Sequence, residues 1–402
     1  MHALIAGGGI AGPVAAMALR QAGIEATIFE SHVPVDGDVG SYFTVTANGL
    51  EALREVGARD VATGAGFVTR RNVLWNHAGR RLATLPLNST IPSSPAAHTM
   101  KRSRLARALQ EEAARRGIPI EFGRRLIDAR VIAGGRVVAA FEDGAEVTGD
   151  LLIGAEGVHS NVRRIIDAEA PSGRYVGLTN FGGFTRGAAG DIEPEAWHLI
   201  FGRRAFFGYQ VTPAGDVVWF ANVPRPKIEP SEREATTATA WKRQLVDAFA
   251  PDDGPAVELI EAGELELAAD NTHDLGHVPT WHRGPMVIIG DAAHAPAPTS
   301  GQGASMAIED AVVLAQALRS EPTVPGAFAA YERARRERVE KIVAWGARGS
   351  SSKTPGRLGR VARDLMMRLF FPLFVNEKSL AWMYDYRIGS GEATAGDASR
   401  AA

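Results

Sequence analysis

The sequence predicts an α/β fold built from two kinds of β-sheet. A short apolar strand, a glycine-rich turn and a helix follow one another at the N-terminus, and two later strands also lead into glycine-rich turns. Between them lies a stretch of alternating, aromatic-rich strands. Continuously apolar strands are typical of a buried parallel sheet, whereas alternating strands are typical of an antiparallel one. We therefore expect a parallel sheet with a second, mixed or antiparallel sheet inserted into its sequence.

The first element is a strand over His2–Ala6, which is apolar enough to lie inside a parallel sheet. It leads into Gly7–Gly12, which has the spacing G-x-G-x-x-G. A helix with apolar residues three positions apart follows and is expected to end at Gly23, and Ala26–Phe29 forms the second strand. A strand, a glycine turn, a helix and a strand in this order predict a dinucleotide-binding unit.

Each residue of this motif has a mechanical role. Gly7 allows the tight turn, Gly9 lets the backbone approach a pyrophosphate at the helix N-terminus, and Gly12 allows the helix to pack close to the strand. Glu30 lies 18 residues after Gly12, where a carboxylate can accept hydrogen bonds from a ribose diol. An acid at this position favours an unphosphorylated ribose, so we expect FAD or NAD rather than NADP in this site.

Two later segments repeat the pattern of a strand followed by a glycine turn. Asp150–Ile153 leads into Gly154–Arg163, and Met286–Ile289 leads into Gly290–Ala295. A glycine-rich turn from Pro298 to Gly303 then precedes an apolar helix. Such a turn presents backbone N–H groups at the positive end of a helix, which suits a ring that becomes anionic on reduction.

The three motifs, in this order, resemble those of the class A FAD-dependent aromatic hydroxylases, which include para-hydroxybenzoate hydroxylase-like and salicylate hydroxylase-like flavoprotein monooxygenases. The resemblance covers residues 1–345. Phe43–Gly57 resembles the family helix after the second strand, Arg102 resembles its flavin-contacting arginine, and Tyr331–Arg336 resembles its helix after the flavin motif. The chain departs from the family in three places. Glu156 stands where Asp is usual, Gly40–Phe43 is bulkier, and Ala304 replaces a frequent Asn.

This resemblance implies a Rossmann-like FAD-binding domain of the GR2 type, with an inserted β-sheet substrate domain and C-terminal helices. The domain division that it implies assigns residues 1–70, 99–170 and 270–345 to the FAD-binding domain, residues 71–98 and 171–269 to the substrate domain, and residues 346–402 to a C-terminal helical region and tail.

The resemblance also implies a reaction and a set of cofactor contacts. NAD(P)H would reduce FAD, O₂ would form a C4a-hydroperoxyflavin, and one oxygen atom would hydroxylate or epoxidise an aromatic or polyketide-like molecule, as in secondary metabolism. Because the cofactor carries the chemistry, no side chain is assigned as a catalytic acid or base. The expected FAD contacts are Gly7, Gly9, Ile10, Ala11, Gly12, Glu30, Ser31, Arg102, Leu126, Glu156, Asp291, Pro298, Gly301, Gln302, Gly303 and Ala304.

The inserted segment is rich in aromatic residues, most of which must form a core. Between residues 175 and 225 these are Tyr175, Phe181, Phe184, Trp197, Phe201, Phe206, Phe207, Tyr209, Trp219 and Phe220. We expect a minority to line an apolar substrate pocket and choose Phe201, Tyr209 and Trp219. A surface connection over Lys227–Arg233 and a helix over Glu234–Ala250, covering the sheet, are also predicted.

The C-terminal part is expected to be helical from Leu358 to Tyr386, with a break or kink at Pro372. This region could dock on the body, form a dimer contact or touch a membrane surface, and the sequence favours the first two. Residues 390–402 are small and polar, which predicts a frayed tail. The chain is expected to be a monomer or a homodimer.

Composition excludes several other classes of protein. The net charge is −2, which disfavours a nucleic-acid binder, and the chain has no cysteine, so disulfides and thiolate metal sites are excluded. We expect a cytoplasmic protein without a membrane span, because the uncharged run Ala3–Leu19 is glycine-rich and shorter than the roughly 20 residues that a span needs. His273 and His277 have a metal-like spacing, but Gly276 and Pro279 break the helix that would align them, so a solvated loop without metal is expected.

Two alternatives to monooxygenation remain. One is another flavin reaction on the same fold, such as halogenation or alkene reduction. Halogenases of this fold carry a W-x-W-x-I-P motif, and none of Trp197, Trp219, Trp241 and Trp281 lies in one. The other is a non-catalytic binding protein, which the intact glycine motifs disfavour.

Overall fold

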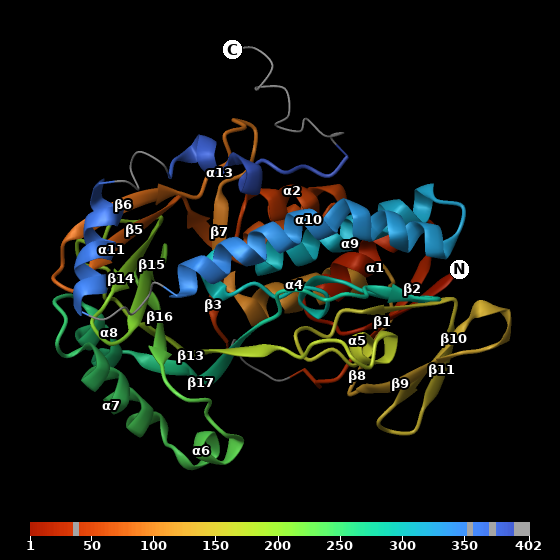
Figure 1. Ribbon diagram of the computed structural model, residues 1–402, viewed down its shortest axis with the longest axis horizontal. Helices are drawn as coiled ribbons and strands as arrows, with labels where there is room; N and C mark the ends of the chain where they lie inside the picture. Colours follow the sequence, from red (N-terminus) through yellow and green to blue (C-terminus); the bar gives the residue numbers. More distant parts are fainter. Residues whose placement is uncertain (35–39, 352–356, 370–374, 390–402) are drawn as a thin grey trace.

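The computed structural model describes residues 1–34, 40–351, 357–369 and 375–389 (Figure 1). Its first sheet is parallel except for one edge strand, as the apolar strands predict. In spatial order it contains β18 (His282–Arg283), β19 (Met286–Ile288), β12 (Leu151–Gly154), β1 (His2–Ala6), β2 (Glu25–Glu30) and β8 (Ile120–Phe122). The interior strands are almost completely buried because helices and a small sheet surround them.

Helices cover this parallel sheet, and the longest of them form a layer with the N-terminal helix (Figure 1). Helix α9 (Gly303–Ser320) packs against α1 (Ala11–Gln21), α2 (Ala47–Glu55) and α10 (Val324–Ser351). Helices α3 (Arg59–Gly64), α4 (Arg102–Arg115) and α5 (Asn161–Ile166) also pack around this sheet. The apolar run predicted to begin at Ala304 is therefore the central, buried helix of this layer.

Two three-stranded sheets flank the parallel sheet. One contains β3 (Tyr42–Val45), β7 (Ala97–Lys101) and β4 (Phe67–Thr69). The other contains β9 (Leu126–Val131), β10 (Val137–Phe141) and β11 (Glu146–Gly149). Short 3₁₀ turns lie at η1 (Ala133–Gly135), η2 (Gly290–Ala292) and η3 (Pro298–Ser300).

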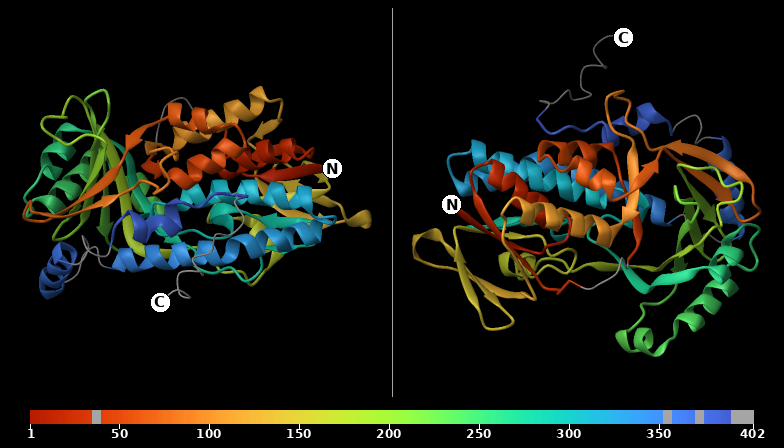
Figure 2. Two further views of the ribbon diagram at one scale, coloured as in Figure 1. Left: turned by 90° about the horizontal axis from the view of Figure 1, so that it is seen from above. Right: turned by 180° about the vertical axis from the view of Figure 1, so that it is seen from behind.

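A seven-stranded mixed sheet forms the opposite end of the molecule (Figure 2). Its order is β17 (Glu264–Asp274), β13 (Arg174–Thr185), β16 (Val217–Pro224), β15 (Phe206–Val211), β14 (Ala196–Phe201), β5 (Arg71–Asn76) and β6 (Arg81–Pro86). Only β14 and β5 pair in parallel. Helices α6 (Pro230–Ala235), α7 (Ala238–Phe249) and α8 (Ala256–Ala262) lie at this end, and Trp241 and Phe249 of α7 contact Phe181 and Phe207 of the sheet.

The structure corrects some element boundaries. Residues Tyr42–Val45 form a strand, so the helix expected over Phe43–Gly57 begins only at Ala47. The single helix expected over Glu234–Ala250 is two helices, because the extended residue Thr237 caps the start of α7 by accepting a hydrogen bond from the backbone N–H of Ala240. The strand assignments of residues 71–86 and 174–274 to one sheet favour the interleaved domain division, whose boundaries stay a prediction.

The C-terminal helices pack on the body. Helix α11 (Arg357–Leu369) contacts β6, and α13 (Glu377–Tyr384) contacts α2. Arg338 of α10 holds α13 by donating hydrogen bonds of 2.9 Å to the carbonyl oxygens of Trp382 and Met383. The expected break at Pro372 and the expected tail over 390–402 lie outside the described residues. Among the helices of the described ranges, none combines the length and the apolar character needed to cross a bilayer.

Candidate functional site

Four strand ends of the parallel sheet open into one large cavity. β1, β2, β12 and β19 run in the same direction, so their carboxyl ends meet at one edge of the sheet. The chain places Gly7, Glu30, Glu156 and Asp291 there, and all four line the cavity. Its volume is about 1860 Å³, whereas pockets for one small ligand usually measure about 300–1,000 Å³. The space therefore suffices for a dinucleotide and a second molecule.

The glycine motif leaves an open cradle at the start of α1. Gly7 has φ +104°, and a Cβ atom there would lie 2.4 Å from the Ala155 carbonyl oxygen. A Cβ on Gly12 would lie 1.9 Å from the Gly7 carbonyl oxygen, whereas a Cβ on Gly9 would meet nothing within 4 Å. Helix α1 has no side-chain cap and no acid in its first turn, so its free N–H groups can bind an anion. The turn fits a pyrophosphate above Gly9.

Glu30 is held in place by backbone N–H groups. Gly8 N–H donates to its Oε2 at 2.7 Å, and His32 N–H donates to its Oε1 at 2.8 Å. Burial alone would raise the pKa of Glu30, but these hydrogen bonds and the His32 ring outweigh burial, so its pKa is lowered. The carboxylate therefore stays ionised near neutral pH, and its remaining lone pairs can accept hydrogen bonds from a ribose.

Glu156, which stands in the second motif where Asp is usual, binds the start of α5. It lines the cavity, but its carboxylate turns back to the start of α5. Ser160 Oγ–H donates to it at 2.5 Å, and the backbone N–H groups of Asn161 and Val162 donate at 3.1 Å each. Burial raises the pKa of Glu156, although these hydrogen bonds oppose the effect. The longer side chain thus serves as a cap for α5, and its contact with a cofactor stays a prediction.

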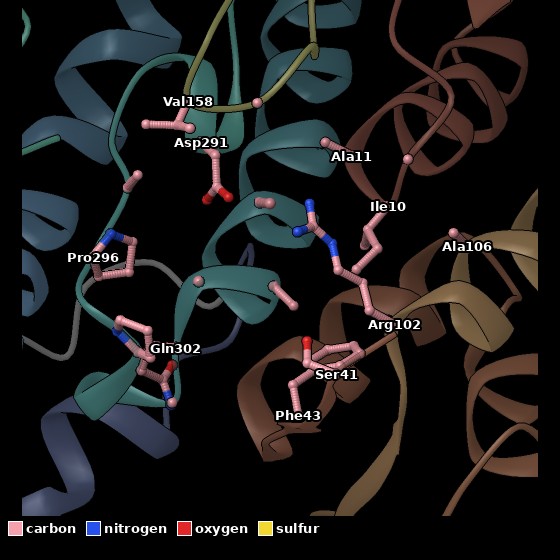
Figure 3. A pocket seen from close by; sticks show the side chains of 18 of the residues that line it. Ile10, Ala11, Ser41, Phe43, Arg102, Ala106, Val158, Asp291, Pro296 and Gln302 are labelled. Carbon is pink, nitrogen blue, oxygen red and sulfur yellow. The ribbon is translucent and has the colours of Figure 1, made fainter. Parts of the chain in front are cut away.

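The third motif faces Arg102 of α4 across the cavity. Figure 3 shows the Asp291 carboxylate and the Arg102 guanidinium pointing into the same space from opposite walls. Helix α9 begins at Gly303 without a side-chain cap and without an acid in its first turn. Gly301 has φ +60° and open space where a Cβ would lie. The loop therefore presents backbone donors of a helix N-terminus to the cavity.

A buried polar network fixes this loop from behind. Gln302 Nε2 donates to Thr46 Oγ1 at 2.9 Å, and Asn48 Nδ2 donates to Gln302 Oε1 at 2.9 Å and to Glu309 Oε1 at 2.6 Å. All of these side chains are buried. Sequence reasoning missed Thr46, Asn48 and Glu309, because the contacts join residues more than 250 positions apart.

The network continues into a cluster of buried charges. Arg335 lies 2.6 Å from Glu309 Oε2 and 2.7 Å from Asp310 Oδ1, and His294 Nε2 lies 2.6 Å from Asp310 Oδ2. Burial would raise the pKa of Asp310, but the charges and hydrogen bonds of His294 and Arg335 lower it to about 2. The pair Glu309–Asp310 inside the apolar sequence of α9 is the only local signal for this cluster that the described part of the chain carries. His294 is thus buried behind the loop, where it pairs with Asp310.

One face of the seven-stranded sheet supplies an aromatic wall, defined as Trp197, Phe201, Phe206 and Phe220. All four line the cavity. Their rings form a continuous row, with centroid distances of 5.3 Å between Trp197 and Phe220, 6.0 Å between Phe220 and Phe206, and 5.0 Å between Phe206 and Phe201. Trp197 is fixed because its Nε1–H donates to Thr99 Oγ1 at 3.0 Å.

The structure places only one of the three expected pocket aromatics in the cavity. Phe201 lines it, whereas Tyr209 and Trp219 lie in the core between the sheet and helices α7 and α8. The reason is the alternation of side chains along a strand, which puts Tyr209 on the face opposite Phe206 and Trp219 on the face opposite Phe220. The choice of Tyr209 and Trp219 as cavity-lining residues was therefore wrong.

The residues predicted to contact FAD line one cavity, with one exception. All predicted FAD contacts other than Gly12 line the cavity. Gly12 acts through its missing side chain, because a Cβ there would strike Gly7. The open cradle at Gly9, the uncapped starts of α1 and α9, and the ionised Glu30 together fit FAD.

His273 and His277, which have a metal-like spacing in the sequence, lie in different surroundings. His273 lies in strand β17 rather than in the expected loop, and its ring contacts those of His159 and Tyr175. His277 is exposed and pairs with Glu340 at 2.8 Å. Within the described ranges, no group of three or more His, Asp or Glu side chains could hold a metal ion.

Comparison with known proteins gives consistent matches. The profile of a family described as FAD binding domain matches residues 1–346. Aurachin C monooxygenase/isomerase from Stigmatella aurantiaca is 32% identical over 377 residues, which cover 91% of this chain and 93% of that protein. FAD-dependent urate hydroxylase from Klebsiella pneumoniae is 30% identical over 350 residues, which cover 85% of this chain and 88% of that protein. The crystal structure of a Klebsiella pneumoniae HpxO variant complexed with FAD is 25% identical and matches with a TM-score of 0.82 over 96% of this chain and 99% of that one.

Proposed function

We propose a substrate class for this chain, which belongs to the FAD binding domain family and is a FAD-dependent monooxygenase of the class A flavoproteins. The proposed reaction uses NAD(P)H and O₂ to hydroxylate or epoxidise an uncharged aromatic or polyketide-like small molecule. When bound, FAD would supply the redox chemistry: two electrons would come from NAD(P)H, one oxygen atom of O₂ would go to the substrate, and the other would leave as water.

The observation that carries this proposal is the absence of charge on the lining of five of the seven strands on the substrate side; the edge strand β17 is the one that contributes ionisable side chains, Asp270 and His273. The cavity-lining residues of β5, β6, β14, β15 and β16 include no ionisable side chain. They are Asn72, Leu74, Leu85, Pro86, Trp197, Leu199, Phe201, Phe206, Phe220 and Asn222. Burial of a charged substrate without a charged partner is costly, so this surface favours an uncharged one.

The surface also indicates the shape of the substrate. The row of four rings in the aromatic wall offers stacking and edge contacts to a planar molecule. Asn72 and Asn222 are the polar side chains among the residues of these five strands that line the cavity, and amides bind carbonyl, hydroxyl or N–H groups. The chain itself would orient the planar substrate against the cofactor and keep water away from the reacting atoms.

The test compares matched substrates that differ in charge. NAD(P)H oxidation is measured with pairs of aromatic compounds, each consisting of a carboxamide and the corresponding carboxylate, and with urate because one relative is named for it. We expect the uncharged member of a pair to stimulate oxidation and to gain one oxygen atom by mass spectrometry. Preferred turnover of the carboxylates or of urate would contradict the proposal. A reduced product without added oxygen would instead support an alkene reductase.

A variant pair separates substrate binding from folding. Phe220→Ala removes a ring from the aromatic wall and is expected to raise KM by about tenfold, because a buried aromatic contact contributes on the order of 1–2 kcal/mol. Phe184→Ala is the control, since Phe184 is equally half-buried but does not line the cavity. Equal KM values for the two variants would contradict the assigned wall.

A further inference from the structure

Helix α11 carries apolar side chains on its outer surface. Leu365, Met366 and Leu369 are 56%, 42% and 51% exposed, and they are three of the few large apolar residues that the described part of the chain exposes. Arg363 and Met367, on the other side of the helix, are buried. Because exposed apolar groups are normally scattered singly, a cluster within one helix indicates a surface with a partner.

The same helix is positively charged. Its sequence, Arg357–Leu369, contains four arginines and one acid, Asp364. Arg368 is exposed, whereas the Arg363 guanidinium lies inward, 4.9 Å from the centre of the Phe201 ring. The sequence that follows the helix is Phe-Phe-Pro-Leu-Phe. A basic helix with an apolar face is typical of a segment that lies in the interface of an anionic membrane.

We propose that the outer face of α11 rests on an anionic lipid surface. The exposed leucines and methionine would enter the boundary between headgroups and acyl chains, and the exposed Arg368 would lie near the lipid phosphates. A second copy of the chain fits this face less well, since a symmetric contact would bring two helices of the same positive charge together. The helix lies at the outer end of the molecule beside β6, where a flat surface can reach it (Figure 1).

If the substrate is the uncharged molecule of the proposed function, the position of α11 would bring the lipid surface close to the substrate part of the cavity. Met367 lines the cavity, and Arg363 packs on Phe201 of the aromatic wall. Asn76 of β5 also donates a hydrogen bond of 3.1 Å to Asp364. One helix therefore has its outer face toward the lipid and its inner face toward the uncharged substrate region. An apolar substrate dissolved in the bilayer would have a short path to the cavity.

The membrane contact can be tested on the FAD-loaded enzyme without a substrate. The protein is sedimented with phosphatidylcholine vesicles, with and without phosphatidylglycerol, at low and high ionic strength. We expect binding to the anionic vesicles that weakens with added salt. The double variant Leu365→Gln, Leu369→Gln is expected to lower the partition coefficient at least about tenfold, because each leucine loses a large part of its transfer free energy.

A matched variant controls for a general loss of apolar surface. Ile127 and Val131 on β9 are 53% and 50% exposed, and Ile127→Gln, Val131→Gln should leave vesicle binding unchanged. Flavin absorbance of each variant checks that the fold is intact. Because the assay measures vesicle binding without a substrate, its result does not depend on whether the proposed catalysis is correct. The proposal is overturned if the wild type does not bind anionic vesicles, if both double variants lose binding equally, or if sedimentation equilibrium shows a dimer that only the α11 variant dissociates.

Discussion

Gly9 and Gly12 lie three residues apart in one turn, but the space around them differs. A Cβ at position 9 would meet nothing within 4 Å and would project into the cavity, whereas a Cβ at position 12 would lie 1.9 Å from a carbonyl oxygen. Gly9→Ala is therefore expected to weaken FAD binding by about tenfold or more with little change in apoprotein stability. Gly12→Ala is expected to lower the apoprotein's unfolding free energy by roughly 3 kcal/mol. Urea unfolding of the apoproteins and FAD titration separate the two effects, and similar apoprotein stabilities would contradict the assignment.

A single substitution can also test whether Asp291 binds FAD. Its carboxylate points into the cavity at the end of β19 (Figure 3). Asp291→Ala removes a charged hydrogen-bond acceptor, so we expect FAD affinity to fall by about ten- to a hundredfold, since such a bond contributes roughly 1.5–3 kcal/mol. The control is Asp60→Ala, because the Asp60 side chain is 95% exposed and lies outside the cavity. If fluorescence titration gives the same affinity for both variants, Asp291 is not a cofactor ligand.

At the scale of elements, α9 and α10 are joined by charges that no solvent reaches. Arg335 is fully buried between Glu309 and Asp310. Arg335→Met leaves these carboxylates short of positive charge, and removal of one partner of a buried ion pair costs about 3–5 kcal/mol. Arg333 lies two residues before Arg335 on α10 and is exposed. Arg333→Met should therefore change the unfolding free energy by less than about 0.5 kcal/mol. Chemical denaturation measures both, and equal values would show that the cluster does not stabilise the helix pair.

The same cluster makes stability depend on pH. The pKa of Asp310 is lowered from 3.8 to about 2 in the folded protein. A lowered folded-state pKa contributes stability that is present above the unfolded pKa and is lost as the pH falls toward the folded one. We therefore expect the unfolding free energy to fall between about pH 4 and pH 2, with a shallower slope in Asp310→Asn than in wild type or in the exposed control Asp60→Asn. Parallel slopes for all three proteins would contradict the role of Asp310.

The seven-stranded sheet shows where sequence reasoning reached its limit. Its aromatic strands could be predicted, but which face of each strand meets the cavity depends on register. Phe201 pairs with Phe206, and Phe206 pairs with Asn222, so these three share the cavity face. Tyr209 and Trp219 also pair, on the other face. If the turn between β14 and β15 were known, it would set the pairing of Phe201 with Phe206 and so place Phe206 on the same face. The sequence of one strand alone does not show which of its two faces meets the cavity.

At the scale of the whole molecule, the parallel sheet was the more predictable half. Its motifs are local, because a strand, a glycine turn and a helix N-terminus are consecutive in sequence around Gly7 and Gly301. The contacts between the halves are not local. Trp197 of β14 donates to Thr44 of β3, and Gln210 of β15 donates to Thr69 of β4 at 2.8 Å. These pairs are more than 140 residues apart, so only the folded chain reveals them.

These contacts predict that the parallel sheet and the seven-stranded sheet unfold together. The cavity is lined by both the parallel and the seven-stranded sheets, and polar pairs such as Gln210–Thr69 tie the latter to the small sheet beside the cofactor region. If the two halves unfold together, a ligand that binds only the folded state must slow hydrogen exchange in both. At a free FAD concentration of about 100 times Kd, the slowest amides of β12 and of β16 should both exchange about 100-fold more slowly, which corresponds to roughly 2.7 kcal/mol. Exchange followed at peptide resolution with and without FAD makes the comparison. Slowing confined to β12 would mean that the seven-stranded sheet opens on its own, and that the aromatic wall can loosen while the cofactor stays bound.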